Sequence, residues 1–414
     1  MDYIPRYLED KFLRISGFFK AVLLTGQRQA GKTTMLKHLA EGQNRKYISL
    51  DNMADRNLAK TDPAYFLQIH KPPVLIDEIQ FAPELFPPIK VICDSSKKNG
   101  LFWLTGSQRY DMMKCIRESL AGRIGLLELH GFSRNELSGA RFSGPLLFDY
   151  ESLKEREARS FPADPAELFN FIWQGGMPRL AAAAVSGGLT PEERNAYFHS
   201  YTETYLLRDA VELGGIRDTF KFVKFCEACA AETSHLVNYK NLAEAAEISL
   251  PTAKEWFSLL RGLGILFVLP PYSNNRLKRL VKTPKFYFYD TGLCAFLAKW
   301  PSPETLMTGA ASGAYFENMV VSEIVKSYGV SAFEPALYYY RDTNQRELDL
   351  IVESGEAVHP LEIKKAALPN DREVQKFSLL KTAKVLPGPG GIICCCDKVS
   401  PIDRNNCRIP AWII

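Results

Sequence analysis

The chain has 414 residues, which is more than one ordinary hydrophobic core accommodates and predicts two or three domains. Hydrophobic residues make up 46% and charged residues 24%, values that exclude a disordered chain and favour an ordinary globular one. The 51 Lys and Arg nearly balance the 47 Asp and Glu, so the net charge of +4 does not by itself indicate a nucleic-acid partner.

The N-terminus and the cysteines favour a cytoplasmic protein that has no membrane partner. Asp2, Glu9 and Asp10 interrupt the apolar residues near the N-terminus, unlike the basic and then continuously apolar plan of a signal peptide. No apolar run approaches the roughly 20 residues of a membrane span. The nine cysteines, an odd number, are typical of free thiols in a reducing compartment.

Residues 1–134 alternate short apolar runs with helical patterns, which predicts a parallel sheet with crossover helices in an α/β domain. We therefore take residues 1–134 as the first domain. The runs expected to form strands are Ala21–Thr25, Lys46–Leu50, Pro73–Ile76, Leu101–Thr105 and Gly125–Leu129.

A phosphate-binding motif lies between the first of these strands and a helical pattern. Residues 26–33 fit the pattern G-x-x-x-x-G-K-[ST], which indicates a P-loop when a strand precedes it and a helix follows. Chance would place this pattern in roughly one or two per cent of chains of this length, and the flanking elements lower that figure further. In such a loop backbone amides surround the β-phosphate, Lys32 neutralises the β- and γ-phosphates, and the Thr33 hydroxyl reaches Mg²⁺. We therefore predict an ATP site made of Gly26, Gln27, Arg28, Gln29, Ala30, Gly31, Lys32, Thr33 and Thr34.

A second, acidic element supports the nucleotide site. Val74–Ile76 is an apolar strand that is followed by Asp77 and Glu78, as in a Walker B motif. On its own such a strand is common and usually structural, but at this distance after a P-loop it favours catalysis. Asp77 is expected to bind Mg²⁺ through its waters, and Glu78 to polarise the water that attacks the γ-phosphate. The predicted protein ligands of this Mg²⁺ are thus Thr33 and Asp77.

Three further side chains are candidates for the same site, each with a structural alternative. The strand Leu101–Thr105 is followed by Gly106 and Ser107, at the sheet edge where ligands of open α/β folds bind. Thr105 or Ser107 either senses the γ-phosphate or caps a turn. Arg123 either acts as an arginine finger on the nucleotide of a neighbouring subunit, which implies a homo-oligomer, or makes an ordinary surface ion pair.

Two segments follow the sheet domain. Residues 135–215 read as mostly helical and are expected to form a lid or linker. Residues 216–290 follow a pattern of helix, helix, turn, helix and hairpin, which resembles a winged helix. Ser249 is the expected N-cap of the helix Pro251–Leu260, and a strand is expected at Ile265–Leu269.

Basic residues in this winged-helix pattern suggest a nucleic-acid partner. Lys254 and Arg261 lie on the expected recognition helix, although its apolar residues, such as Trp256 and Phe257, show that much of this helix faces a core. A basic hairpin suits phosphate contacts and favours DNA, while winged helices also bind proteins. The basic residues of the hairpin are Arg276, Lys278, Arg279, Lys282 and Lys285.

Residues 291–414 predict a second α/β domain. A helix is expected at Tyr315–Lys326 and is followed by a run of short strands. The expected strands are Ala336–Tyr340, Glu347–Glu353, His359–Ile363 and Gly391–Cys396.

Acidic residues in this last domain form a candidate metal centre. Alternation places Glu362 and Lys364 on one face of a strand, and Asp349 joins them if the two strands are neighbours. Glu317, from the preceding helix, completes the cluster. The carboxylates would bind Mg²⁺, which activates water, while Lys364 stabilises charge on a phosphate. The alternative is two amphipathic strands with a solvated charged face, and spacing alone does not decide between them.

Together these motifs resemble a known family, the prokaryotic AAA-type ATPases with a C-terminal domain of unknown function related to PD-(D/E)xK nucleases. The resemblance covers most of the chain and implies the order ATPase, winged helix and α/β restriction-endonuclease-like domain. Leu348 stands where the literal nuclease motif has Pro before Asp349. The matching stretches are Gly26–Thr34, Asp77–Gln80, Leu104–Ser107, Leu120–Arg123, Gly175–Pro178 and the two acidic strands.

The leading hypothesis is a cytoplasmic, Mg²⁺-dependent ATPase whose nucleotide state controls DNA binding and, in the last domain, Mg²⁺-dependent cleavage. The alternative is a non-cleaving, ATP-dependent switch that binds DNA or a protein partner. The two hypotheses differ at Asp349, Glu362 and Lys364.

Overall fold

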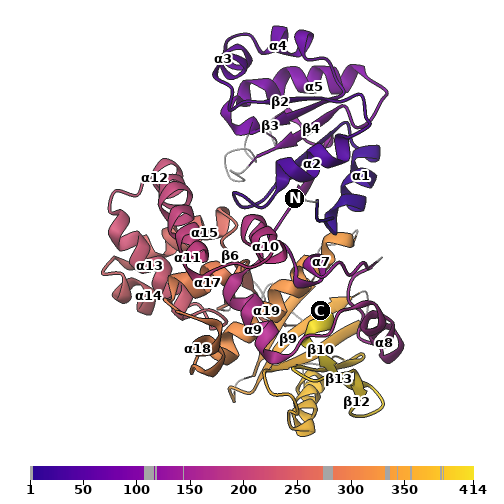
Figure 1. The fold of residues 1–414 in the computed structure, drawn as a ribbon, viewed down its shortest axis with the longest axis vertical. Coiled ribbons are helices and arrows are strands. Elements are labelled where there is room, and N and C mark those ends of the chain that lie inside the picture. The colour runs from indigo at the N-terminus through magenta and orange to yellow at the C-terminus, as the bar shows by residue number, and fades with distance from the viewer. Residues whose placement is uncertain are drawn as a thin grey trace. The chain divides into compact units, whose positions relative to one another are not determined.

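The computed structural model describes residues 3–106, 116, 119–142, 144–273, 283–331, 336–342, 344–354, 357–382, 385 and 387–414. The chain divides into two compact units (Figure 1). The first comprises residues 1–131 together with 260–264, and the second comprises 132–259 and 265–414. The predicted domain boundaries within the second unit remain predictions.

The first unit is built on a five-stranded parallel sheet in the order β2-β3-β4-β1-β5, as the alternating pattern predicts. All five predicted strands are confirmed within a residue or two. The strands are β1 (Ala21–Thr25), β2 (Lys46–Ser49), β3 (Val74–Asp77), β4 (Phe102–Thr105) and β5 (Ile124–Glu128). The helices are α1 (Leu8–Phe18), α2 (Lys32–Ala40), α3 (Met53–Thr61), α4 (Pro63–Ile69) and α5 (Phe86–Ser95), with short 3₁₀ turns at Ile79–Phe81 and Pro83–Leu85.

The three central strands β3, β4 and β1 are buried on both faces, which explains why they are apolar runs. Along β1, Ala21 and Leu23 face a core that α4 and α5 cover, whereas Val22 and Leu24 face a second core beneath α1 and α2. Figure 1 shows helices on both sides of the sheet. Because β1 and β3 both run parallel to β4, their carboxyl ends lie at one edge of the sheet, where the P-loop follows β1 and Asp77 is the last residue of β3.

The second unit begins with the helical segment that the sequence predicts after residue 135. No helix in the described part of the chain is long and apolar enough to cross a membrane. The helices are α7 (Arg134–Leu137), α8 (Tyr150–Arg159), α9 (Pro165–Gln174), α10 (Pro178–Val185), α11 (Pro191–Tyr201), a π-helical turn (Thr202–Leu206) and α12 (Leu207–Gly214).

Three helices and a two-stranded antiparallel sheet follow, in the predicted order. Leu236 adds a bridge to Lys285 at the edge of this sheet. Ser249 is confirmed as an N-cap, because its Oγ accepts from the N–H of Thr252 at 3.2 Å. The elements are α13 (Thr219–Ala231), α14 (Tyr239–Ala245), α15 (Leu250–Gly262), β6 (Leu266–Leu269) and β7 (Lys285–Phe288).

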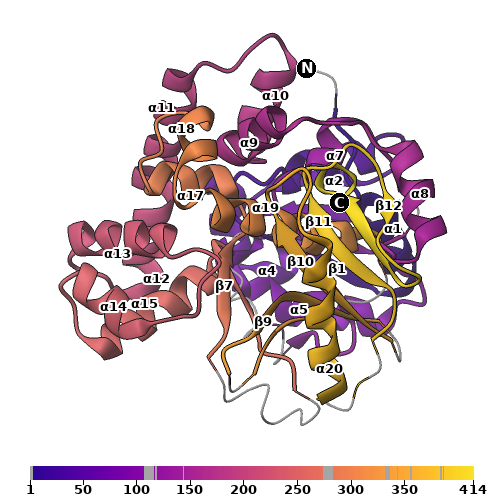
Figure 2. The ribbon, with the colours of Figure 1, turned by 90° about the horizontal axis from the view of Figure 1, so that it is seen from below.

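The C-terminal part contains a six-stranded mixed sheet in the order β12-β13-β11-β10-β9-β8 (Figure 2). Helix α19 packs against β10 and β7. The helices are α17 (Thr291–Leu297), α18 (Pro303–Thr308), α19 (Ser312–Ser327) and α20 (Leu379–Thr382), with 3₁₀ turns at Tyr328–Val330, Asp371–Ser378 and Ala411–Ile413. The strands are β8 (Ala336–Arg341), β9 (Glu347–Ser354), β10 (Ala357–Lys364), β11 (Gly390–Cys394), β12 (Ser400–Pro401) and β13 (Asn406–Pro410).

The Gly-Gly pair between α9 and α10 has a packing role. Gly175 has φ 79°, and a Cβ there would lie 2.4 Å from a carboxylate oxygen of Asp290. The N–H of Gly176 donates to the other oxygen of Asp290 at 2.8 Å. Asp290 also caps α17 through the N–H of Leu293. The glycines therefore let the backbone approach a buried carboxylate closely.

The amide side chain of Asn318 fixes α19 to β7. Its Oδ1 accepts from the N–H of Phe288 at 2.9 Å, and its Nδ2 donates to the carbonyl of Phe288 at 2.8 Å. Its Oδ1 also accepts from the hydroxyl of Thr233. Because Asn318 is fully buried, these bonds replace contacts that water would otherwise make, and they set the neighbouring Glu317 opposite β7.

We expect Asn318→Ala to destabilise the second unit by about 2–4 kcal/mol, because it leaves two backbone groups and a hydroxyl buried without partners. Urea denaturation followed by tryptophan fluorescence measures this. Asn241→Ala, at an exposed position of α14, is the control and should change stability by less than about 0.5 kcal/mol. Equal stability of the two variants would contradict this role of Asn318.

Candidate functional site

The P-loop follows β1 and leads into α2 as predicted. Gly31, with φ 91°, precedes the first residue of α2, Lys32. The side chain of Lys32 is buried, and its Nζ donates to the carbonyls of Gly26 and Gln27 at 3.0 and 2.9 Å. The lysine ammonium is thus held inside the loop by backbone oxygens, next to the N-terminal N–H groups of α2.

Gly26 is required at the start of this loop by close packing. It has φ 139°, and a Cβ at this position would lie 2.0 Å from the carbonyl oxygen of Leu129. Of the other predicted phosphate-binding residues, Gln27 and Ala30 are buried, Arg28 is half-buried, and Gln29 and Thr34 are exposed. Gln29 also has a positive φ of 61°. The loop therefore combines left-handed backbone conformations with a buried cation.

Asp77 ends β3 as a buried carboxylate that accepts from three hydroxyl groups. Its Oδ1 accepts from Thr33 Oγ1 at 2.8 Å and from Thr105 Oγ1, and its Oδ2 accepts from Tyr47 OH at 3.0 Å. Burial and the negative charge of Asp77 raise the pKa of Tyr47 to about 12. The structure therefore brings together Thr33 and Asp77, the two predicted ligands of Mg²⁺.

Glu78 adopts the left-handed backbone conformation, with φ 58° and ψ 46°. Its N–H donates to Thr105 Oγ1 at 3.1 Å, and its carboxylate accepts from the amide of Gln80. A non-glycine residue in this conformation carries backbone strain, which often accompanies a functional role. The hydroxyl of Thr105, which the sequence analysis named as a candidate sensor of the γ-phosphate, joins Asp77 to the N–H of Glu78. The role as a sensor remains a prediction.

Two predicted residues near this site have different outcomes. Ser107 lies outside the described residues. Arg123 makes a two-contact ion pair with Asp94, one contact at 3.1 Å between Nη2 and Oδ2. Both side chains are partly exposed. The contact is therefore the ordinary surface ion pair that the sequence analysis gave as the alternative to an arginine finger. The role as an arginine finger remains a prediction.

The C-terminal candidates Asp349, Glu362 and Lys364 also lie together. The register of β9 and β10 pairs Leu350 with Leu361, and Asp349 and Glu362 are the next residues along these strands. Lys364 Nζ lies 2.9 Å from Asp349 Oδ2 and 2.8 Å from Glu362 Oε2. One ammonium group therefore bridges the two predicted metal ligands.

Glu362 is fully buried. Lys376, from the 3₁₀ turn Asp371–Ser378, adds a second ion pair to Oε2 at 3.2 Å. Oε1, in contrast, has no hydrogen-bond partner among the described residues. Burial, and next the charge of Asp349, raises the pKa of Glu362 to about 7, although Lys364 opposes this rise. Glu362 is thus a buried carboxylate, and the residues that the structure describes supply no hydrogen-bond donor to one of its two oxygens.

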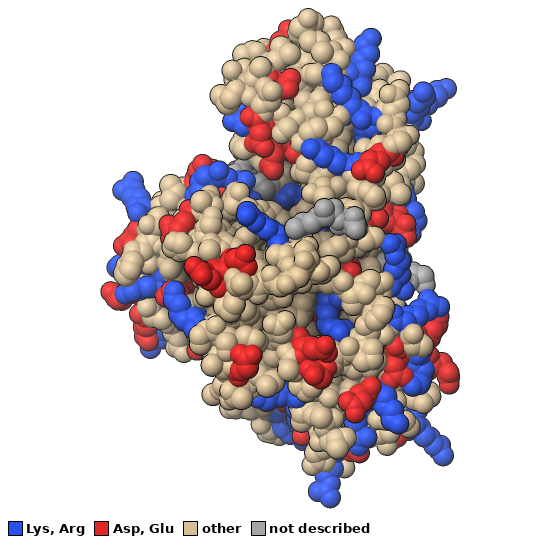
Figure 3. Space-filling model, viewed as in Figure 1, with Lys and Arg blue, Asp and Glu red and all other residues tan. Residues whose placement is uncertain are grey.

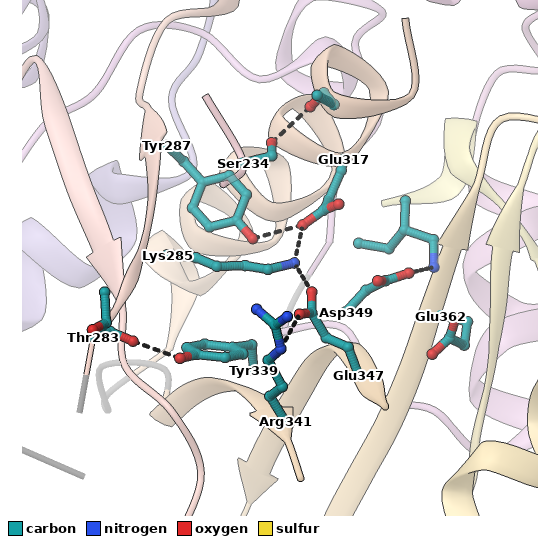
Figure 4. Close-up of polar contacts among 12 residues, drawn as sticks. Ser234, Thr283, Lys285, Tyr287, Glu317, Tyr339, Arg341, Glu347, Asp349 and Glu362 are labelled. Carbon is teal, nitrogen blue, oxygen red and sulfur yellow. Dashed lines mark hydrogen bonds and ion pairs between the residues drawn. The ribbon is translucent and has the colours of Figure 1, made fainter. Parts of the chain in front are cut away.

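Glu317, the third predicted ligand, is bound by residues of β7 (Figure 4). Its Oε1 accepts from Lys285 Nζ at 3.0 Å and from the hydroxyl of Tyr287 at 2.8 Å. Lys285 Nζ also lies 2.5 Å from Glu347 Oε1. Burial raises the pKa of Glu317 to about 7, and the charge of Lys285 opposes this rise.

Lys285 corrects one sequence interpretation. We expected it in a basic hairpin that contacts phosphate, whereas its side chain is buried. Burial alone would lower its pKa, but the charges of Glu317, Glu347 and Asp349 outweigh burial and raise the pKa. The physical reason is that a lysine in an otherwise apolar strand requires buried acidic partners. The other four basic residues of the hairpin, Arg276, Lys278, Arg279 and Lys282, lie outside the described residues.

The carboxylates of this cluster do not converge on one point. Within the residues that the structure describes, no group of three or more His, Cys, Asp or Glu side chains is placed so that it could bind a metal ion. Lys285 and Lys364 instead lie among Glu317, Glu347, Asp349 and Glu362. The residue types suit Mg²⁺, and the unpartnered Oε1 of Glu362 is an available ligand atom, but ammonium groups neutralise the acids.

Comparison with protein families agrees with the geometry of the first unit. Residues 18–138 match the family model of an AAA domain. This part of the chain is therefore similar to AAA domains, and the match includes the P-loop and the Asp77 strand that the motifs predict. Residues 166–304 and 312–414 match models that are each described as a domain of unknown function (DUF8612 and DUF4143). The predicted nuclease relation is not among these matches.

Two curated relatives match the chain along most of its length. Uncharacterized proteins of Mycobacterium tuberculosis and Mycobacterium bovis are each 28% identical over 372 residues, which cover 89% of this chain and 76% of theirs. Among solved structures, the Walker-type ATPase of Pyrococcus abyssi has 16% identity and a TM-score of 0.45, and covers 72% of this chain and 96% of its own. The RuvB Holliday junction branch migration motor of Thermotoga maritima has 18% identity and a TM-score of 0.31, and covers 64% and 90%.

We expect Lys32→Ala to weaken ATP binding by roughly 100-fold, because the loop loses its charge-assisted bonds to the phosphates. Titration with a fluorescent ATP analogue measures this. Lys60→Ala, on the exposed side of α3, is the matched control and should bind as the parent does. Undiminished binding by Lys32→Ala would overturn the assignment of the phosphate site.

Proposed function

We propose that the chain is an Mg²⁺-dependent ATPase whose nucleotide state controls how the second unit engages a nucleic acid. The observation that carries the ATPase part is the 2.8 Å contact between Thr33 and Asp77 beside the buried Lys32. Thr33 and Asp77 are the residues that would bind Mg²⁺, which supplies positive charge to the phosphates. In the bound state Lys32 would exchange the carbonyls of Gly26 and Gln27 for the β- and γ-phosphates.

Glu78 is the residue that we propose to orient the attacking water. Its carboxylate is bonded to Gln80, so it must exchange this amide for water when hydrolysis begins. Thr105, which bonds to both Asp77 and the N–H of Glu78, keeps the two acids in a fixed relation. Arg123 would have to leave Asp94 to reach a nucleotide bound by a second copy of the chain.

The nucleic-acid part rests on α13, α14, α15 and the β6–β7 hairpin, whose order supports a winged helix. On α15, Lys254 and Arg261 are exposed and available to phosphates. The face of the molecule in Figure 3 shows acidic and basic side chains interspersed rather than a continuous basic stripe. The exposed Lys254 and Arg261 support DNA as the partner of α15 and its hairpin, and the interspersed charges of this face favour the alternative, a protein partner.

Cleavage by the last domain is a second candidate function. The order of α19, the antiparallel strands β8 to β10 and the parallel strand β11 supports a nuclease-like domain. The contact of Lys364 with both Asp349 and Glu362 suits a phosphodiesterase centre. The neutralisation of these acids by lysines favours the other hypothesis, a switch that binds without cutting.

We expect Glu78→Gln to retain ATP but to hydrolyse it about 10²–10⁴-fold more slowly, because the amide cannot act as a base toward water. Phosphate release under saturating ATP and Mg²⁺, together with ATP affinity, measures both effects. Glu84→Gln, in a nearby 3₁₀ turn, should hydrolyse at the parent rate. Hydrolysis by Glu78→Gln at that same rate would remove Glu78 from the reaction.

The nuclease hypothesis predicts that the parent protein cuts DNA or RNA with Mg²⁺ or Mn²⁺. Asp349→Ala and Glu362→Ala should then lose cleavage and metal binding together, while ATP hydrolysis continues. Lys364→Ala should keep metal binding and lose about 3–4 kcal/mol of transition-state stabilisation, as oxyanion donors do. Gel analysis of strand integrity and phosphate release test this. Intact strands, with DNA binding that does not need a metal, would instead establish the non-cleaving switch.

A further inference from the structure

Tyr47 connects an edge strand of the first unit to the predicted Mg²⁺ ligand Asp77. Strand β2 lies at one edge of the sheet, next to β3. The register pairs Ser49 of β2 with Asp77 of β3, and strand alternation places Tyr47 on the same face of β2 as Ser49. From this position the long phenol side chain reaches Asp77, and its hydroxyl donates to Oδ2 at 3.0 Å. The P-loop and Walker B patterns in the sequence do not include this tyrosine.

The ring of Tyr47 lies near the surface, although its hydroxyl is directed at the site. Tyr47 is 37% exposed. The ammonium of Lys37 lies 3.8 Å from the centre of the ring, at a distance where a cation is attracted to the aromatic face. Lys37 is one helical turn beyond Thr33 on α2. Tyr47 therefore contributes a polar group to the site more than apolar area to the core, so removal of its hydroxyl should disturb folding little.

Three neutral hydroxyls bond to Asp77 and divide its two oxygens unequally. Oδ1 accepts from Thr33 Oγ1 at 2.8 Å and from Thr105 Oγ1. Among the described residues, Oδ2 accepts only from Tyr47. An ionised carboxylate has about four acceptor positions. The position that these bonds leave open is therefore on Oδ2, the oxygen that Tyr47 holds.

Thr33 is placed in a complementary way. Its hydroxyl hydrogen is used in the bond to Asp77, so the lone pairs of its oxygen point away from that carboxylate. Hydroxyl and carboxylate oxygens are hard donors of the kind that Mg²⁺ prefers. The donor set therefore fits Mg²⁺, with the oxygen of Thr33 and the open position on Oδ2 of Asp77 available to the ion or to its waters.

The direction of Asp77 matters because Mg²⁺ demands nearly ideal octahedral geometry. A carboxylate turns readily about its bond to Cβ, since this torsion has only broad minima. The bonds from Thr33 and Thr105 restrain Oδ1, and the bond from Tyr47 restrains Oδ2. Unlike an ammonium group, a neutral hydroxyl does this without cancelling the charge of the carboxylate.

We propose that Tyr47 is a positioning residue of the ATPase site, whose hydroxyl orients Oδ2 of Asp77 so that Mg²⁺ can strengthen nucleotide binding. This inference rests on the proposed ATPase function and adds to it a residue from an edge strand. In this role Tyr47 acts through Asp77. Burial, and next the charge of Asp77, raise the pKa of Tyr47 to about 12, so the hydroxyl keeps its proton and remains a donor at neutral pH.

The test measures how much a divalent ion strengthens the binding of a fluorescent, non-hydrolysable ATP analogue to the full chain. The dissociation constant in EDTA, divided by that in Mn²⁺, gives this metal enhancement without any hydrolysis. Tyr47→Phe keeps the ring and removes only the hydroxyl. It should bind the analogue as the parent does in EDTA, whereas its metal enhancement should fall about tenfold or more, since outer-shell partners of metal ligands typically contribute about 10–100-fold.

Two further variants serve as controls. Tyr65→Phe removes the hydroxyl of another exposed tyrosine of the same unit, on α4, and should keep the metal enhancement of the parent. Asp77→Asn should lose most of the enhancement, and adding Tyr47→Phe to it should change little more, because the hydroxyl acts through the carboxylate. If circular dichroism shows that Tyr47→Phe does not fold, Tyr47→Leu provides the same test.

The role of Tyr47 is overturned if the folded variant keeps the metal enhancement of the parent. It is also overturned if analogue binding falls equally in EDTA and in Mn²⁺, because Tyr47 would then support the P-loop and not the metal ligand. A parent protein that binds the analogue equally in EDTA and in Mn²⁺ would instead reject the proposed Mg²⁺ site itself, and the role of Tyr47 with it. In hydrolysis assays, Tyr47→Phe should need about tenfold more Mg²⁺ for half of its maximal rate.

Discussion

A carboxylate that leaves water must be surrounded by donors or cations, and both candidate sites are arranged by this requirement. Asp77 is satisfied by the hydroxyls of Thr33, Tyr47 and Thr105. The acids of the C-terminal cluster are satisfied mainly by lysine ammonium groups. Neutral hydroxyls leave the charge of Asp77 available to a metal ion, whereas ammonium groups neutralise the charge of their partners.

This difference separates two sites that the sequence motifs present as similar. A short strand with an acidic residue predicts a metal ligand in both units, and only the neighbours of that residue distinguish the cases. Beside Asp77 the neighbours come from β2, β4 and the P-loop, at the ligand-binding edge of a parallel sheet. Beside Glu317 they come from β7, which the sequence analysis assigned to a different module.

The sheet of the first unit could be predicted from sequence because its central strands β1, β3 and β4 are buried on both faces and stand out as apolar runs. The P-loop has a fixed spacing and flanking elements, so its residues could be named in advance. The strands β12 and β13 were missed, since Ser400–Pro401 is only two residues long and Asn406–Pro410 lacks a continuous apolar pattern. The stretch Gly175–Pro178 matches the family, but the sequence gives no physical reason for its two glycines. The reason is the side chain of Asp290, which is distant in sequence and approaches both of them.

The partners of the C-terminal acids could not be predicted, because they are distant in sequence. Lys285 and Glu317 are 32 residues apart and meet only when Asn318 joins α19 to β7. One local feature of the sequence does indicate the buried position of Lys285. Lys285 begins a strand whose other residues are Phe286, Tyr287 and Phe288, and a lysine in so apolar a strand indicates a buried acidic partner.

The two-residue repeat of β9 also limits how related chains can vary in length. Glu347 and Asp349 alternate with the buried Leu348 and Leu350. A single inserted or deleted residue within this stretch would exchange the two faces beyond that point, moving a carboxylate into the apolar core and a leucine into the cluster. Evolutionary gaps should therefore be absent from β9 between Glu347 and Leu350, except where residues are gained or lost in pairs.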